Sequence, residues 1–157
     1  MNQMHAYPIP SETSAFSTSP IVAYAREASD GQEIADLPLH STLQLIRRLF
    51  SLGSNWDGHG SAAPRRESVD SSLAVIRLFR NLVVSVGQRW AQPHVSTNED
   101  GNVVFEWWQG TRKLTVYVRS AHVTYIKVWG VNIDSEMEDG CVTDMGFASL
   151  WIWLNEA

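Results

Sequence analysis

The sequence lacks the features that would place it in an oxidising or membrane environment. Its 157 residues include one cysteine, Cys141, so no disulfide can form within the chain, and this fits a reducing compartment. No apolar run approaches the ~18 residues of a membrane-spanning helix. Residues 1–10 lack the basic stretch and the following apolar stretch of a secretory signal. We therefore expect a soluble, cytoplasmic protein with no membrane partner.

Basic residues are also scarce, and they are unevenly distributed. Lys and Arg number 12 against 17 Asp and Glu, and this net charge of -5 argues against a polybasic nucleic-acid binder. Residues 134–157 carry six acidic and no basic side chains, whereas residues 39–133 carry 11 basic and six acidic ones. Segregated charge of this kind can present surfaces of opposite sign to partners, although ordinary fluctuation in a small protein explains the same counts.

The segment near the N-terminal end lacks apolar runs, apart from the patch Ile21-Val22-Ala23-Tyr24. Residues 1–38 consist mainly of Ser, Thr, Pro, Ala and acidic residues. Such a composition buries too little apolar surface to offset the conformational entropy that the chain loses on folding. We predict a polar N-terminal arm over 1–38, a candidate for disorder, and a single α+β domain over 39–157.

Apolar spacing in the remainder predicts three helices. A capping-box pattern begins at Ser41, and the apolar stripe that follows it ends at Gly53. A second stripe with the helical period covers 66–86. The third helix is expected over 143–155, near the C-terminal end of the sequence.

Between the second and third helices the apolar period falls to two residues, which is typical of strands. Strands are expected over 93–97, 103–108, 113–119 and 123–129, and short turns separate them. Strands so close in sequence pair as antiparallel neighbours. The fold class expected is α+β: two helices, a three- to four-stranded antiparallel β-meander and a C-terminal helix. Residues 131–142 are expected to form an acidic connection.

Alternation along the strands predicts a sheet face toward the helices and a face toward solvent. The expected core set is Phe105, Trp107, Leu114, Val116, Val118, Thr124, Ile126 and Val128. The opposite set combines aromatic with charged residues, which concentrate where proteins bind partners. We predict partner contacts there at Trp108, Tyr117, Tyr125, Lys127 and Trp129. Glu136, Glu138 and Asp139 are expected to add negative charge to the contact.

The aromatic face is also compatible with two purely structural roles. The N-terminal arm or the last helix could cover it. Cross-strand aromatic pairs could also serve only to stabilise the sheet.

A glycine-bracketed loop holds the strongest candidate for chemistry. Asp57 and His59 could perform acid–base catalysis or join a metal site. No nucleophile elbow or metal-ligand spacing accompanies them, so we expect no catalytic residue, metal or cofactor. We favour a structural loop of Trp56, Asp57, Gly58, His59 and Gly60. In it Trp56 anchors into the core, Asp57 accepts backbone N–H groups, and the glycines adopt positive φ.

This loop, Asn55-Trp56-Asp57-Gly58-His59-Gly60-Ser61-Ala62, and the hairpin from Asp100 to Trp107 resemble a large family of small bacterial proteins without an established activity. Those proteins carry an Asn-Trp-Asp-Gly-Tyr-Gly-Ala loop between two helices and then a Gly-x-x-x-x-Glu-Trp hairpin. Here His59 replaces the Tyr and Ser61 replaces the Ala. The resemblance covers 39–129 and implies the same order of helices and hairpin. By analogy with small acidic proteins of mobile and defence gene sets, it also suggests an antitoxin, immunity or phage-related role.

The hypothesis that follows is a non-enzymatic protein-binding module that occludes a partner protein of unknown identity, as antitoxins, immunity proteins and inhibitors do. One alternative is a small enzyme that uses Asp57 and His59. Another is a binder of single-stranded nucleic acid that uses the aromatic face for base stacking. A homodimer is compatible with each of these.

Overall fold

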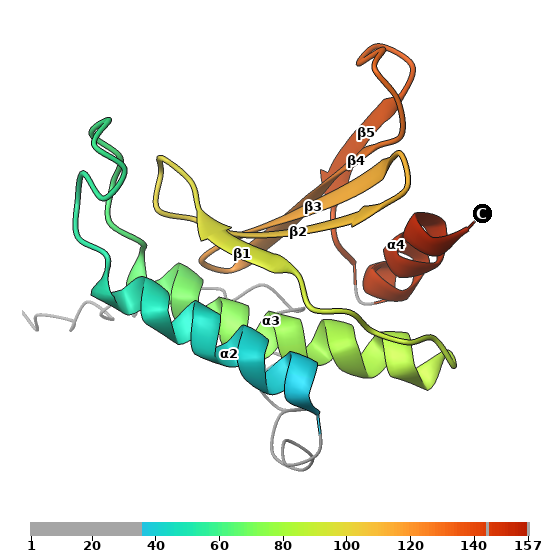
Figure 1. Cartoon of the computed structure of the whole chain (residues 1–157), viewed down its shortest axis with the longest axis horizontal. Helices are drawn as coiled ribbons and strands as arrows, with labels where there is room; N and C mark the ends of the chain where they lie inside the picture. The colour runs from blue at the N-terminus through green and yellow to red at the C-terminus, as the bar shows by residue number, and fades with distance from the viewer. Residues whose placement is uncertain (1–35, 144, 157) are drawn as a thin grey trace, which may run out of the picture.

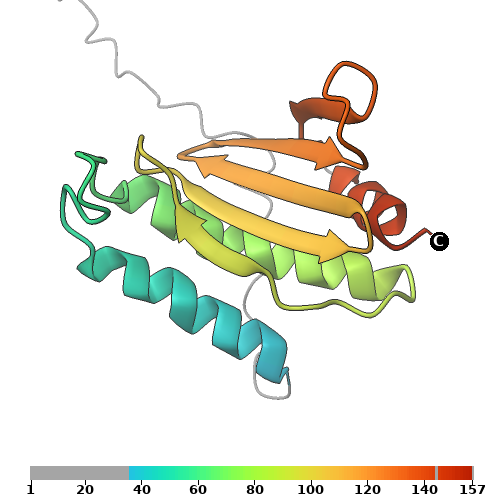
Figure 2. The same cartoon turned by 45° about the horizontal axis from the view of Figure 1, so that its top comes forward.

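Three α-helices lie on one face of a five-stranded antiparallel sheet in the computed structural model, which describes residues 36–143 and 145–156 (Figures 1 and 2). The strands are ordered β1-β2-β3-β4-β5. The helical elements are α2 (Leu37–Arg48), the 3-10 turn η1 (Leu49–Ser51), α3 (Arg66–Ser85) and α4 (Gly146–Asn155). The strands are β1 (His94–Thr97), β2 (Val103–Gln109), β3 (Arg112–Arg119), β4 (His122–Val128) and β5 (Met137–Cys141). The expected α+β class and C-terminal helix are confirmed, and the sheet has one or two strands more than expected.

The additional strand, β5, lies in the segment 131–142 that was expected to be an acidic connection. It pairs antiparallel with β4, with Lys127 opposite Glu138 and Val128 opposite Met137. Its sequence Met-Glu-Asp-Gly-Cys has no apolar alternation. A short charged strand at the edge of a sheet needs none, because it buries little and its charges discourage pairing with another chain.

An aromatic cluster joins the helices to the sheet. The ring of Phe79 in α3 stacks on Phe147 of α4 at 4.5 Å between centroids and meets Trp107 of β2 edge-on at 5.0 Å. Trp151 of α4 completes the cluster, 5.9 Å from Trp107. All four side chains are buried. Trp107 is therefore a core residue, as expected, and Trp151 is another.

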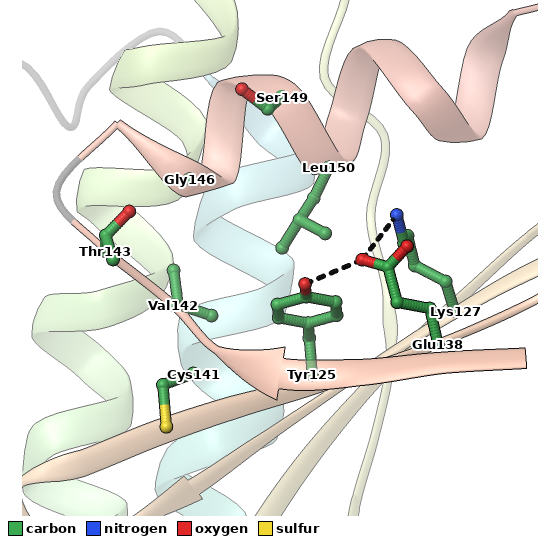
Figure 3. Close-up of a pocket in the computed structure, with 9 residues that line it drawn as sticks. All are labelled: Tyr125, Lys127, Glu138, Cys141, Val142, Thr143, Gly146, Ser149 and Leu150. Atoms are coloured by element: carbon green, nitrogen blue, oxygen red, sulfur yellow. Dashed lines mark hydrogen bonds and ion pairs between the residues drawn. The ribbon is translucent and has the colours of Figure 1, made fainter.

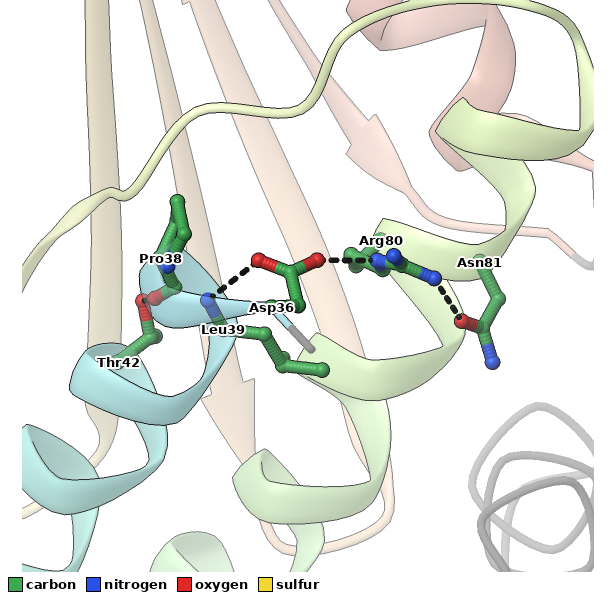
Figure 4. Close-up of polar contacts among 6 residues, drawn as sticks. All are labelled: Asp36, Pro38, Leu39, Thr42, Arg80 and Asn81. Atoms are coloured by element: carbon green, nitrogen blue, oxygen red, sulfur yellow. Dashed lines mark hydrogen bonds and ion pairs between the residues drawn. The ribbon is translucent and has the colours of Figure 1, made fainter. Parts of the chain in front are cut away.

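Helix α2 begins earlier than the capping box at Ser41 predicts. Its N-cap is Asp36, which accepts a hydrogen bond from the Leu39 backbone N–H at 3.1 Å (Figure 4). The other carboxylate oxygen of Asp36 accepts from Arg80 Nε of α3 at 2.6 Å. This contact between helices outweighs the local capping signal. The arm predicted over 1–38 thus overlaps the first turn of α2, and residues 1–35 lie outside the described residues.

The remaining helix boundaries follow the sequence more closely. Helix α3 begins at Arg66 as expected and ends at Ser85, one residue early. Helix α4 begins at Gly146 rather than at Thr143, whose backbone carbonyl accepts a hydrogen bond from the Gly146 N–H at 2.8 Å. No helix within the described residues is long and apolar enough to cross a membrane.

The connection between α2 and α3 docks onto the β1–β2 turn and joins the two motifs of the sequence. The Ala62 N–H donates to the Glu99 carbonyl at 2.9 Å, and the Arg65 N–H donates to the Gly101 carbonyl at 2.8 Å. Gly101 has φ +76°, and a Cβ there would lie 2.3 Å from the Ala63 carbonyl oxygen. Glycine is required at this position by both the backbone conformation and the close approach.

We predict that Gly101→Ala destabilises the protein more than Gly110→Ala does. Gly110 also has positive φ (+58°), but nothing lies within 4 Å of the Cβ it would gain. Alanine at position 110 adds only backbone strain of about 1 kcal/mol, whereas at position 101 it also separates the docked segments, at a further cost of about 1–3 kcal/mol. Urea unfolding of both variants measures the difference. Equal losses of unfolding free energy would show that the docking contact contributes nothing.

Candidate interaction surface

The sheet face opposite the helices is not covered by any helix or strand in the part of the chain that the structure describes (Figure 2). Two of the predicted contact residues, Trp108 and Tyr117, lie on this open face. Trp108 stands opposite Lys113, and Tyr117 stands opposite Val104. Both pairs alternate along β2 and β3 with the residues that face the helices, so their side chains project to the other side of the sheet.

Strand β4 presents the opposite faces from those expected. Tyr125 lies opposite Val116, and Lys127 lies opposite Leu114. Residues directly opposite each other in an antiparallel pair project to the same side. Tyr125 and Lys127 therefore point toward the helices, and the prediction that they share a face with Trp108 is wrong.

The same correction applies to Trp129, just beyond the end of β4. Its ring meets Trp153 of α4 edge-on at 6.0 Å, so it lies on the helix side. The expected core residues of β4 are in turn on the open face. These are Thr124, Ile126 and Val128. Sequence alternation was ambiguous here because β4 carries apolar residues on both faces and α4 covers one of them.

On the helix side, Tyr125, Lys127 and Glu138 form a polar network across β4 and β5 (Figure 3). The Tyr125 hydroxyl donates to Glu138 Oε1 at 2.9 Å, and Lys127 Nζ lies 2.8 Å from the same oxygen. Lys127 Nζ also lies 5.2 Å from the centre of the Trp153 ring. The network fastens the edge strand to its neighbour and to α4, which accounts for these residues without a partner.

The network shifts two pKa values in opposite directions. The Lys127 ammonium and the Tyr125 hydroxyl lower the pKa of Glu138, because both contacts favour the carboxylate. The hydrogen bond to Glu138 raises the pKa of Tyr125, because it holds the phenol proton in place. Beside this network is a pocket of about 300 Å³ that also includes Val142, Thr143 and Leu150. The Cys141 side chain points away from it (Figure 3).

The open face ends in a cross-strand row that we call the end row: Trp108, Lys113, Val128 and Met137. Trp108 is 55 % exposed and Met137 is 37 % exposed. Lys113 Nζ lies 5.1 Å from the centre of the Trp108 ring and 2.5 Å from Glu106 Oε1. The end row thus presents an apolar surface, in which the Lys113 ammonium makes a cation–π contact with the Trp108 ring.

The predicted negative residues are also divided between sites. Glu138 belongs to the helix-side network, whereas Asp139 is on the open face, opposite Ile126. The Glu136 carboxylate accepts from the Asn132 backbone N–H at 2.8 Å and closes the β4–β5 loop. Sequence reasoning overlooked Met137 because its segment was expected to be a connection. Its position beside acidic residues gave no strand signal.

The loop from Asn55 to Ser61 uses its carboxylate to hold its own backbone. Asp57 accepts from the His59 N–H at 3.0 Å and from the Ser61 hydroxyl at 2.5 Å. The Ser61 hydroxyl is the largest cause of the lowered pKa of Asp57. The glycines at 58 and 60 have φ +77° and +86°. These hydrogen bonds and positive φ values are the arrangement of a structural turn.

Trp56 was expected to anchor into the core, and this prediction is wrong. Trp56 is 38 % exposed, and its Nε1 donates to the Ala62 carbonyl at 3.2 Å. The ring lies along the loop, so it stabilises the turn that precedes the docking segment. Trp90, for which the sequence gave no clear position, is buried.

Comparisons with protein-family models, with curated proteins and with solved structures gave no match. The resemblance of the loop and hairpin to small bacterial proteins therefore stays an expectation. Within residues 36–143 and 145–156, no three His, Cys, Asp or Glu side chains gather as metal ligands. The geometry of the open face is thus the main guide to function.

We predict that Glu138→Gln removes a pH-dependent part of the stability. A carboxylate with a lowered pKa in the folded state stabilises the protein above its ordinary pKa of 4.5, and this contribution is lost as the pH falls through the folded value. The difference in unfolding free energy between wild type and variant should therefore be constant near neutral pH and shrink below 4.5. Urea unfolding over this range measures it. A difference independent of pH would contradict the assigned ion pair.

Proposed function

We propose that this chain is a non-enzymatic protein-binding module that occludes a partner protein through the open sheet face. The observation that carries the proposal is the end row, where Trp108 is 55 % exposed on a face that no described helix covers. Tryptophan is enriched among the residues that dominate binding energy. An exposed tryptophan on a regular strand is a natural centre for such a contact.

The surroundings of Trp108 support this role. Lys113 lies against its ring, and Glu106 links Lys113 to His94 with contacts of 2.5 Å and 3.3 Å. A side chain held in this way loses less conformational entropy when a partner binds. The sheet also fixes its position more firmly than a loop would. Occlusion by a rigid face is the mode expected of an antitoxin, immunity protein or inhibitor.

Single-stranded nucleic acid is a second candidate for the same face. Trp108 and Tyr117 lie there together with Lys113 and Arg119, and aromatic rings beside cations form base-stacking surfaces. The acidic strand β5 opposes it, since Asp139 also lies on this face. No comparable observation favours an enzyme, because the oxygens of Asp57 are engaged within its own loop.

The test is affinity capture from the cell that encodes the protein, with wild type, Trp108→Ala and Phe50→Ala as baits. Phe50 is the matched control, because this aromatic residue is 46 % exposed on η1, away from the open face. We expect a protein that is captured by wild type and Phe50→Ala and is reduced about tenfold or more with Trp108→Ala, as for a hot-spot residue.

Three results would contradict the proposal. Capture that survives Trp108→Ala would remove the end row from the interface. Strong, salt-dependent binding of a single-stranded oligonucleotide, lost in the same variant, would favour the nucleic-acid candidate. A stable homodimer by light scattering that Trp108→Ala dissociates would assign the face to a second copy of the chain.

A further inference from the structure

The β4–β5 loop carries two aliphatic side chains that the packing of the described residues leaves in solvent. Val131 is 99 % exposed and Ile133 is 69 % exposed. The loop projects beyond the end of β4, away from α2 and α3 (Figures 1 and 2). Single exposed aliphatic residues are common on proteins, but two on one short loop beside the end row extend an apolar surface.

The loop is held in one conformation by its own polar groups. The Asn132 carbonyl accepts from the backbone N–H of Glu136 at 2.7 Å, and the Glu136 carboxylate accepts from the Asn132 N–H at 2.8 Å. The Asp134 N–H donates to the Asn132 side chain at 3.1 Å. A Cβ on Gly130 would lie 2.2 Å from this same Glu136 carboxyl group. Val131 and Ile133 are therefore displayed on a preorganised tip, which lowers the entropy lost on binding.

The charge around the tip restricts what it can bind. Residues 128–157 contain no Lys or Arg, and Asp134, Glu136 and Asp139 lie within this segment. The two lysines near the base of the loop are paired with carboxylates, Lys127 with Glu138 at 2.8 Å and Lys113 with Glu106 at 2.5 Å. This negative charge repels nucleic-acid phosphates and anionic lipid surfaces. It favours a protein surface on which Lys or Arg side chains surround an apolar depression.

We infer that the β4–β5 loop inserts Val131 and Ile133 into an apolar pocket rimmed by basic residues on the partner protein. The inference rests on the proposed function, because it describes the chemistry of the same partner. The loop lies next to the end row, since Val128 ends β4 and Met137 begins β5. One partner surface can therefore cover both the tip and Trp108.

The test places a photo-crosslinking benzoylphenylalanine at position 131 of the full chain in the cell that encodes it. Position 84 is the control, since Val84 is 43 % exposed on α3 and lies away from the loop. We expect a crosslink from position 131, absent from position 84, to an apolar peptide of another protein with Lys or Arg beside it. Asp134→Asn with Asp139→Asn should reduce its yield severalfold.

Crosslinks to anything but such a peptide would overturn the inference. Crosslinks to lipid, to nucleic acid or to a second copy of the chain would each show that the tip binds something other than a partner protein. The absence of any crosslinked product above the control would show that the tip binds no partner. Trp108→Ala separates this inference from the proposed function. If Trp108→Ala abolishes capture while position 131 gives no crosslink, the open face binds a partner without the loop. If position 131 crosslinks a protein whose capture survives Trp108→Ala, the loop binds without the open face.

Discussion

The stack of Phe79 on Phe147, with ring centroids 4.5 Å apart, determines which side of the sheet is covered. Because Phe79 also meets Trp107 of β2, the same ring ties α3, α4 and the sheet together. Aromatic pairs of this kind contribute about 0.5–1.5 kcal/mol each beyond the area they bury. The cluster places both helices on one face, and Trp108, the next residue along β2, must then point to the other. Core formation and exposure of the candidate surface are thus two consequences of one strand's alternation.

A second constraint fixes the end of the sheet farther from the end row. The segment after the glycine-bracketed loop bonds to the β1–β2 turn, and Gly101 allows the two backbones to touch. The segment that follows the loop therefore contributes directly to the fold. The carboxylate of the loop, Asp57, is engaged by Ser61 and His59 within the same turn. The polar residues that most resembled catalytic groups in the sequence are accounted for by this architecture.

Much of the fold could be predicted where local pattern and tertiary packing agree. Helix α3 and the turn at Asp100 and Gly101 follow directly from apolar period and turn chemistry. The faces of β4 could not be predicted, because Tyr125 and Ile126 both suit a buried position and contact with α4 decides between them. Strand β5 carried no apolar signal at all. The face of the candidate surface was predicted for only two of its five expected contacts: Trp108 and Tyr117 are on the open face, whereas Tyr125, Lys127 and Trp129 lie on the helix side.

The face assignment of β4 can be measured by native-state thiol labelling in a Cys141→Ser background. Val123, 4 % exposed, lies opposite Val118 on the helix side, and Thr124 lies opposite Tyr117 on the open face. Cysteine is close in size to both residues, so each single replacement should fold. We predict that Thr124→Cys reacts with a maleimide under native conditions at least tenfold faster than Val123→Cys. The thiol at position 123 is buried, so its labelling requires transient local unfolding. Faster labelling of Val123→Cys would show that the helices cover the other face, and the surface around Trp108 would lose its role.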